Sequence, residues 1–321
     1  MSAPVFRGQP ATLIVNPAAA GGRVGREWTT LEARIREALG DSLQCVWTER
    51  QGHGVELARD AVTQGSKTII SLGGDGTHHE VLNGLMAAGG DAEDVRFGVL
   101  HAGTGGDFRR VLHGGGDFET SLKRLPTAGS FHIDVGSVSY LRDDGEPESR
   151  FFLNLASAGL AGVVDRMVNA SGKRLGGTLT FLLATLKGVA RYTPAEVRLT
   201  VDGTRLGDKT VTNVCIANAP WAGGGMQFAP SARLADGLLE VIVFKSVGLL
   251  TSLTLAPKLY KGTHVHTPHI EVYRGREIRV EPLSDEPVLL DIDGESPGRL
   301  PAVYSVHHRA IRLLDLNPDW A

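Results

Sequence analysis

Three glycine-rich turns constrain the fold of this chain most, because each follows a short apolar run typical of a buried strand. The apolar runs cover residues 12–16, 68–72 and 97–101, and the turns cover 16–22, 73–77 and 103–107. Helical patterns at 27–39, 55–64 and 78–88 alternate with these runs and with a further strand pattern at 43–48. This alternation predicts a parallel sheet with helices on both faces. The glycine turns would then share one edge, beyond the carboxyl ends of the strands.

Glycine turns at such an edge suit phosphate groups. Without side chains, the backbone N–H groups can close on phosphate oxygens, and the following helix offers its positive N-terminus. Thr77 and Thr104 add hydroxyl donors. The chain has neither a Walker A loop nor a GxGxxG fingerprint. One such turn would be an ordinary tight turn, but three along one edge predict a nucleotide site.

Strand patterns dominate the chain after about residue 129. They cover residues 132–138, 151–155, 196–201, 212–217, 238–244, 269–272, 277–280 and 288–292, with one helical pattern at 177–191. This part is predicted to form an antiparallel β domain, a sandwich or a barrel. We therefore expect a nucleotide-binding α/β domain at 1–130 and a β-sandwich substrate domain at 131–302. A strand pair within 303–321 is expected to return to the first domain.

Composition and charge limit the kinds of molecule and compartment that we expect for this chain. The 321 residues carry a net charge of −3, so there is no general positive field of the kind that nucleic-acid binders use. The N-terminus lacks a signal-peptide pattern, and the longest apolar stretch, 178–186, is about half the roughly 20 residues that a membrane span needs. Cys45 and Cys215 have no metal-type spacing. A reduced, cytoplasmic protein that does not bind nucleic acid is expected.

The motifs resemble those of one family. The second turn, Gly73-Gly74-Asp75-Gly76-Thr77, is followed by Glu80, Asn83 and Gly84, and this series resembles the signature of the diacylglycerol kinase catalytic domain family. That family includes bacterial lipid kinases, sphingosine kinases and ceramide kinases. Further matches, in the family's order, are the Asn-Pro turn at 16–22, Thr48-Glu49 with Gly52-His53, Gly103-Thr104-Gly105, Gly223-Gly224-Gly225-Met226, 235–239 and Asp293-Gly294-Glu295.

The resemblance implies a two-domain lipid kinase. The first domain would be an α/β domain of the phosphofructokinase and NAD-kinase type, and the second an all-β sandwich. The implied reaction transfers the γ-phosphoryl of ATP to a lipid hydroxyl, with diacylglycerol as the default acceptor and phosphatidic acid as the product. ATP and Mg²⁺ are the implied cofactors. The enzyme would contact the membrane surface transiently from the cytoplasm; the sequence does not select an oligomeric state, and a homodimer is compatible with it.

The resemblance also assigns residues. Nucleotide contacts are expected at Asn16, Pro17, Ala18, Ala19, Ala20, Thr48, Gly73, Gly74, Asp75, Gly76, Thr77, His78, His79, Gly103 and Thr104. Asp293 and Glu295 would supply the base, or its orienter, for the lipid hydroxyl, in a cleft between the domains. Asp75, the third residue assigned to catalysis, would serve the ATP-bound Mg²⁺ directly or through water, because Mg²⁺ favours one or two carboxylates beside phosphate oxygens. A second Mg²⁺ would be held by the Asp236 side chain and the carbonyls of Arg233 and Leu238.

Other interpretations stay open. Asp236-Gly237 and Asp293-Gly294 are also ordinary turn sequences. The chain has Gly106 where the family usually has asparagine, and His78 and His79 where it has an aliphatic residue and asparagine. A kinase of a soluble substrate, related to NAD kinases, or a catalytically silent nucleotide sensor are the alternatives. Arg166, Lys173 and Arg174 before the apolar stretch favour either a helix covering the β core or one contacting lipid.

Overall fold

The chain forms two compact units. The computed structural model describes residues 9–92, 94–103, 105–171 and 192–321. Unit 1 comprises Met1–Val135, Leu234–Asp236 and His308–Ala321, and unit 2 comprises Gly136–Arg233 and Gly237–His307. Two long strands, β5 (Ser130–Arg142) and β14 (Gly298–Leu314), each contribute residues to both units.

Unit 1 contains the predicted parallel sheet. Its strands are β1 (Ala11–Val15), β2 (Gln44–Trp47), β3 (Thr68–Gly73) and β4 (Arg96–His101), in the order β4-β3-β1-β2. All three pairings are parallel, so the carboxyl ends of the strands lie at one edge. The end of β14 adds a further parallel strand, pairing Arg312 and Leu313 with Arg96 and Phe97.

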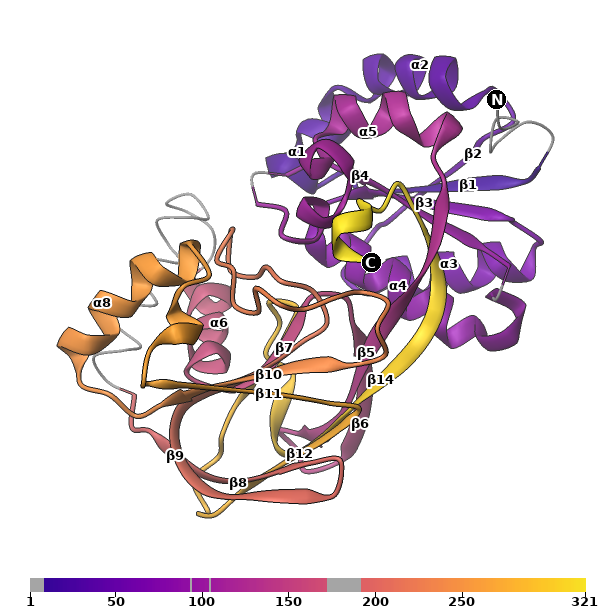
Figure 1. The fold of residues 1–321 in the computed structure, drawn as a ribbon. Coiled ribbons are helices and arrows are strands. Elements are labelled where there is room, and N and C mark those ends of the chain that lie inside the picture. The colour runs from indigo at the N-terminus through magenta and orange to yellow at the C-terminus, as the bar shows by residue number, and fades with distance from the viewer. Residues whose placement is uncertain (1–8, 93, 104, 172–191) are drawn as a thin grey trace. The chain divides into compact units, whose positions relative to one another are not determined.

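Helices cover both faces of this sheet, as Figure 1 shows. The helices α2 (Trp28–Leu39) and α5 (Phe118–Arg124) lie on one side, and α3 (His53–Thr63) and α4 (Asp75–Ala88) lie on the other. A short helix, α1 (Ala19–Arg26), overlaps the first glycine turn and has non-helical backbone angles at Ala20, Gly21 and Gly22. β1 and β3 are buried along their whole length, which explains why they are almost continuously apolar.

Unit 2 is built from antiparallel strands. Its main sheet has the order β11-β10-β9-β8-β12-β14, and β7 pairs with both β9 and β13. The strands are β6 (Pro147–Phe152), β7 (Leu155–Gly159), β8 (Ala195–Val201), β9 (Thr204–Ala217), β10 (Leu239–Lys245), β11 (Ile270–Gly275), β12 (Glu277–Pro282) and β13 (Leu290–Ile292). Two helices accompany them, α6 (Leu160–Ser171) and α8 (Leu249–Tyr260).

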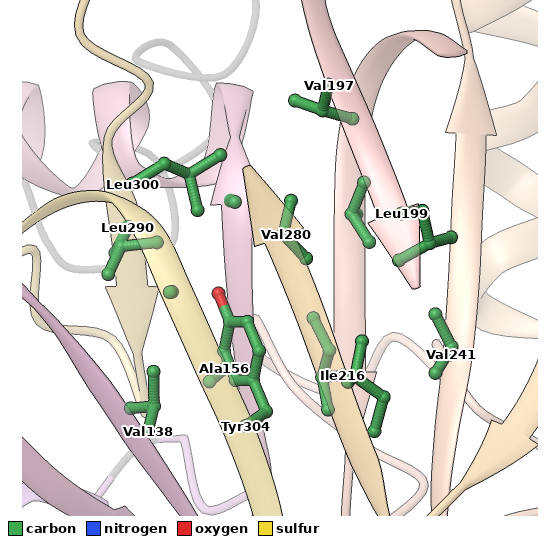
Figure 2. Close-up of a cluster of buried hydrophobic side chains, with 14 of the residues drawn as sticks. Val138, Ala156, Val197, Leu199, Ile216, Val241, Val280, Leu290, Leu300 and Tyr304 are labelled. Carbon is green, nitrogen blue, oxygen red and sulfur yellow. The ribbon is translucent and has the colours of Figure 1, made fainter. Parts of the chain in front are cut away.

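A large apolar core lies within unit 2. It gathers side chains from most of these strands, among them Ile216, Val280 and the fully buried Tyr304 (Figure 2). Burying a side chain of this size stabilises a fold by roughly 1.5–3 kcal/mol, so a strand face of such residues favours the layered arrangement. The predicted fold class, an α/β unit followed by an antiparallel β unit, is confirmed.

Two predicted elements differ from the structure. The segment 151–155 is not one strand, because β6 ends at Phe152 and β7 begins at Leu155. The backbone amides of this break are bound by an acidic side chain instead of a strand partner. Residues 303–314 belong to the single strand β14 instead of a strand pair. The predicted helix at 177–191, with Lys173 and Arg174, lies outside the described residues.

No helix within the described residues is long and apolar enough to cross a membrane.

Candidate functional site

The first glycine turn leaves β1 and is fixed by Asn16. Its side-chain amide donates to Thr77 Oγ1 at 2.9 Å, and its Oδ1 accepts from the backbone N–H of Ala18 at 3.0 Å. The backbone after Ala18 then takes positive φ at Ala20, Gly21 and Gly22 (53°, 65° and 83°). Glycine adopts this conformation without steric cost. Asn16 therefore joins the first turn to the second.

The second glycine turn connects β3 to α4. A Cβ at Gly73 would lie 2.3 Å from Thr77 Oγ1, so only glycine allows Thr77 to sit over the end of the strand. The extended residue Gly74 caps α4, and its carbonyl accepts from the N–H of Thr77. A helix N-terminus following a glycine turn is a favourable place for phosphate oxygens.

Asp75 ties the second turn to the third. Its carboxylate accepts from the backbone N–H groups of Gly106 and Asp107 at 3.1 Å each, and of Phe108 at 3.4 Å. These bonds commit both of its oxygens to the neighbouring turn. Asp75 therefore shapes the third turn, and its predicted service to the ATP-bound Mg²⁺, directly or through water, stays a prediction.

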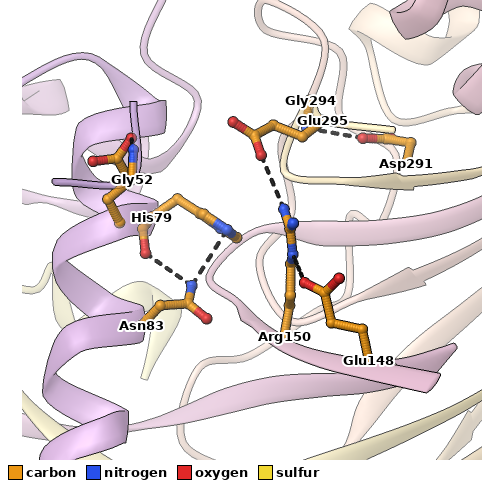
Figure 3. Close-up of polar contacts among 9 residues, drawn as sticks. Gly52, His79, Asn83, Glu148, Arg150, Asp291, Gly294 and Glu295 are labelled. Carbon is orange, nitrogen blue, oxygen red and sulfur yellow. Dashed lines mark hydrogen bonds and ion pairs between the residues drawn. The ribbon is translucent and has the colours of Figure 1, made fainter. Parts of the chain in front are cut away.

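The two histidines after Thr77 face inward. His78 is fully buried, and its Nδ1 lies 2.7 Å from Ser71 Oγ, in the core instead of on a surface that a nucleotide could contact. Burial holds the pKa of His78 well below its ordinary value. His79 is 7% exposed, and its Nε2 lies 3.3 Å from Asn83 Nδ2, as Figure 3 shows.

The remaining predicted contacts of unit 1 lie at the same sheet edge. Thr48 follows β2, and its N–H donates to the Val15 carbonyl at 2.9 Å. Gly103 follows β4, where the N–H of Ala102 donates to the Gly73 carbonyl. Thr104 lies outside the described residues. The structure thus brings the three turns together by hydrogen bonds.

Glu80 has a role that the sequence did not indicate. Its carboxylate accepts from the N–H groups of Gly52 and Gly54 at 2.8 and 2.9 Å, at the start of α3 (Figure 3 labels Gly52). A carboxylate there also complements the helix dipole. Gly84 allows α3 and α4 to pack closely, because a Cβ would lie 2.4 Å from the Val55 carbonyl oxygen. The signature residues Glu80 and Gly84 therefore position α3 against α4.

In unit 2, Asp293 binds backbone. Its Oδ2 accepts from the N–H of Leu153 at 2.8 Å, and its Oδ1 accepts from Asn154 and Leu155 at 3.0 and 3.1 Å. Asp293 and Gly294 both have positive φ (49° and 89°), as the tight acidic turn requires. Asp293 therefore fixes the break between β6 and β7, and this geometry favours an orienting role over that of a proton acceptor.

Glu295 is held by an arginine that no sequence motif indicated. Arg150 Nη1 lies 3.1 Å from Glu295 Oε2, and the same guanidinium contacts Glu148 at 2.8 Å (Figure 3). The side chain of Glu295 is 33% exposed, so solvent reaches it. Glu295 thus differs from Asp293 in being paired with a side chain, and the catalytic roles of Glu295, Asp293 and Asp75 stay predictions.

A second pair of acids supports the same turn. Asp291 accepts from the N–H of Gly294 at 2.8 Å (Figure 3), and α6, which carries Asp165, packs against β13. Both residues are 9% exposed. Burial, followed by the charge of Asp165, raises the pKa of Asp291 well above its ordinary range. Burial also raises the pKa of Asp165.

The predicted ligands of a second Mg²⁺, Arg233, Asp236 and Leu238, fall within one irregular segment that leads into β10. One carboxylate and two carbonyls are oxygen donors, which Mg²⁺ prefers. Within the described residues there is no group of three or more histidine, cysteine, aspartate or glutamate side chains that could hold a metal ion. The second Mg²⁺ site remains a prediction.

Comparisons with known proteins agree with this geometry. Residues 10–138 match the model of the diacylglycerol kinase catalytic domain, and residues 154–315 match that of the YegS C-terminal NAD kinase beta sandwich-like domain. A diacylglycerol kinase of Bacillus subtilis is 27% identical over 307 residues, covering 95% of each chain. A diacylglycerol kinase of Mycobacterium tuberculosis is 27% identical over 310 residues, covering 94% of each.

Solved structures share the fold. One from Bacillus anthracis superposes with a TM-score of 0.78 at 25% identity, covering 98% of this chain and 97% of that one. Yeast NADH kinase in complex with NADH gives a TM-score of 0.54 at 11% identity, covering 97% of this chain and 85% of that one, which is a likeness of fold alone. The chain therefore belongs to the lipid kinase family that joins a diacylglycerol kinase catalytic domain to a YegS-type C-terminal domain.

Proposed function

We propose that this kinase transfers the γ-phosphoryl of ATP to the hydroxyl of diacylglycerol, giving phosphatidic acid and ADP. The observation that carries the proposal is the set of three glycine turns bonded to one another through Asn16, Thr77 and Asp75. Because these bonds form within the protein, the turns are shaped before a nucleotide arrives. Pre-shaped backbone donors are what phosphoryl transfer requires, since its catalysis is mostly positioning and charge stabilisation.

The chemistry divides between the two units. ATP is proposed to place its phosphates on the glycine turns of unit 1. The contacts would come from Gly73–Thr77 and His79, and from residues 16–20, Thr48, Gly103 and Thr104. The lipid oxygen attacks the γ-phosphorus, and the bond from that phosphorus to the β–γ bridging oxygen breaks. The hydroxyl proton passes to the carboxylate of Glu295 of unit 2, whose turn Asp293 holds in shape.

Magnesium enters the proposal only as the ion that accompanies ATP, where it would neutralise phosphate charge. The carboxylate of Asp75 is bound to the third turn, so Asp75 is proposed to act on the phosphates by shaping that turn instead of binding the ion. Arg233, Asp236 and Leu238 remain the proposed ligands of a second Mg²⁺ that would order the segment before β10.

The acceptor is proposed to come from a membrane surface that the enzyme contacts transiently from the cytoplasm. The likeness to kinases named for diacylglycerol supports this choice of lipid. The β-sheet unit is proposed to hold the lipid, because it carries Glu295. Both cysteines are free thiols, as a reducing compartment allows.

The test is a transfer assay with γ-labelled ATP and Mg²⁺. Mixed micelles carry diacylglycerol, ceramide, a long-chain base or phosphatidylglycerol, and NAD is offered in a separate reaction. Labelled phosphatidic acid from the wild type, and about 100-fold less from Glu295→Gln, is the expected result. Label on NAD alone would assign a soluble substrate, and ATP binding without transfer to any acceptor would assign a sensor; each would refute the proposal.

A further inference from the structure

A chain of buried polar groups runs beneath the third glycine turn. Ser71 of β3, His78 of α4 and His101 of β4 are at most 5% exposed. Ser71 Oγ lies 2.7 Å from His78 Nδ1, and His78 Nε2 lies 3.4 Å from His101 Nδ1. The far nitrogen, His101 Nε2, is buried against the turn, and no described residue gives it a well-formed hydrogen bond.

The hydrogen bonds that link Ser71, His78 and His101 can all run in the same donor-to-acceptor direction. Burial lowers the pKa of both rings, more strongly for His78, so each neutral imidazole carries one N–H. When the Ser71 hydroxyl donates to His78, His78 donates to His101, and the proton of His101 is on Nε2. A phosphate can only accept hydrogen bonds, so it would select this direction.

The third turn is shaped around that nitrogen. Gly106 has a φ of +95°, and a Cβ there would lie 2.6 Å from His101 Nε2 and 2.6 Å from Arg109 Cδ. A Cβ at Gly103 would lie 3.1 Å from the same nitrogen. The resemblance leads one to expect an asparagine at position 106, and the imidazole of His101 fills the space that such a side chain would need.

Arg109 lies beside the same position. Its Nε donates to the Gly105 carbonyl and its Nη1 to the Gly115 carbonyl, both at 3.2 Å, so the guanidinium spans the turn. A cation at the turn and an unsatisfied buried donor below it are both complementary to an anion.

We infer that His101 and Arg109 together replace the asparagine missing at position 106, and that they bind the phosphates of the nucleotide at the third turn. The inference rests on the proposed nucleotide site and adds two specificity-determining residues to it. Ser71 and His78 act through His101, by holding its ring with Nε2 under the turn.

The experiment compares two substitutions of similar size. His101→Gln keeps an N–H donor near the position of Nε2, whereas His101→Leu removes it. ATP affinity is measured by calorimetry in the presence of Mg²⁺, and adenosine is titrated as a competitor. A hydrogen bond to a charged group contributes roughly 1.5–3 kcal/mol, which corresponds to a rise in Kd of about tenfold or more for His101→Leu. His101→Gln should stay within about threefold of wild type.

Arg109→Ala should also weaken ATP binding by about tenfold, while Arg142→Ala, in an exposed hairpin ion pair of unit 2, should not. The competition constant of adenosine should be unchanged in every variant, because only the phosphates lose contacts. Equal ATP affinity of His101→Leu and wild type would overturn the inference, as would equal losses for His101→Leu and His101→Gln.

The thermal melting of each variant is recorded to identify misfolding. Should His101→Leu not fold, Gly106→Ala provides the second test, since its Cβ would displace the ring of His101 and weaken ATP binding. Wild-type ATP affinity in Gly106→Ala would overturn the inference. A wild-type protein that binds no ATP would instead refute the proposed function itself, so the two failures are distinguishable.

Discussion

Asp293 and Glu295 are separated by one residue, yet substitution of Asp293 should mainly lower stability, whereas substitution of Glu295 should mainly lower the transfer rate. In Asp293→Asn, Oδ1 can still accept from the N–H groups of Asn154 and Leu155, but the new amide nitrogen faces the N–H of Leu153. One charge-assisted bond is lost and a nearly buried donor, on a residue 1% exposed, is left without an acceptor. The cost is roughly 1.5–3 kcal/mol.

This loss of stability should lower the melting temperature. For a unit of this size, 1 kcal/mol lowers the melting temperature by about 2–4 °C, so Asp293→Asn should melt about 3–12 °C lower than wild type. Glu295→Gln weakens a part-exposed ion pair with Arg150, which contributes about 0–1 kcal/mol, and should melt within a few degrees of wild type. Its transfer rate should nevertheless fall about 100-fold.

Two assays separate the roles: thermal unfolding by circular dichroism, and transfer of label to lipid well below the melting temperature of either variant. The assignment fails if Glu295→Gln retains wild-type transfer. It also fails if Asp293→Asn melts with the wild type while losing all transfer, because Asp293 would then be the proton acceptor.

Three further substitutions test the packing of each unit. Gly84→Ala should destabilise the protein by about 1–3 kcal/mol, because the new Cβ would clash with the Val55 carbonyl. Gly90→Ala is the control, since a Cβ there would have no atom within 4 Å. Equal melting temperatures of the two variants would contradict the close packing of α3 and α4. Glu80→Gln should cost about 1–2 kcal/mol in thermal unfolding, since one of two amides at the start of α3 loses its acceptor, and an unchanged melting temperature would refute the capping role. Because burial raises the pKa of Asp291, folding takes up protons, and wild-type stability falls as pH rises through that raised pKa. Asp291→Asn should therefore melt at a higher temperature than wild type at neutral pH, and this difference in melting temperature should shrink toward about pH 4. A difference that stays constant with pH would contradict the prediction.

The sequence predicted the scaffold well because the signals involved are local. In β3, for example, the apolar residues that predict a buried strand lie within a few residues of Gly73, which predicts the following turn. Three such units in a row leave little choice beyond a parallel sheet with its turns at one edge. The antiparallel unit was predicted less sharply at 151–155, where the interruption depends on Asp293, about 140 residues later in the chain.

Side-chain partners were the part that the sequence did not predict. Asp75 occupies a phosphate turn, so its carboxylate was assigned to Mg²⁺, but its hydrogen-bond donors come from residues more than thirty positions away. His78 was expected at the nucleotide because the resemblance assigns the stretch Gly73–His79 to it, yet the helix turns its ring toward Ser71. Arg150 sits in a strand without a motif, and only the fold brings it to Glu295.

Three acidic residues of the motifs share one mode of action. Asp75, Glu80 and Asp293 each accept hydrogen bonds from two or more backbone N–H groups at a turn or a helix start. A carboxylate used in this way fixes the backbone within the protein alone, so less conformational entropy remains to be lost when the substrate binds. Such residues matter to the reaction through the shape of the turns. Glu295 differs, because its carboxylate pairs with the side chain of Arg150 and is part-exposed, and a side chain held there can exchange a proton without opening a turn.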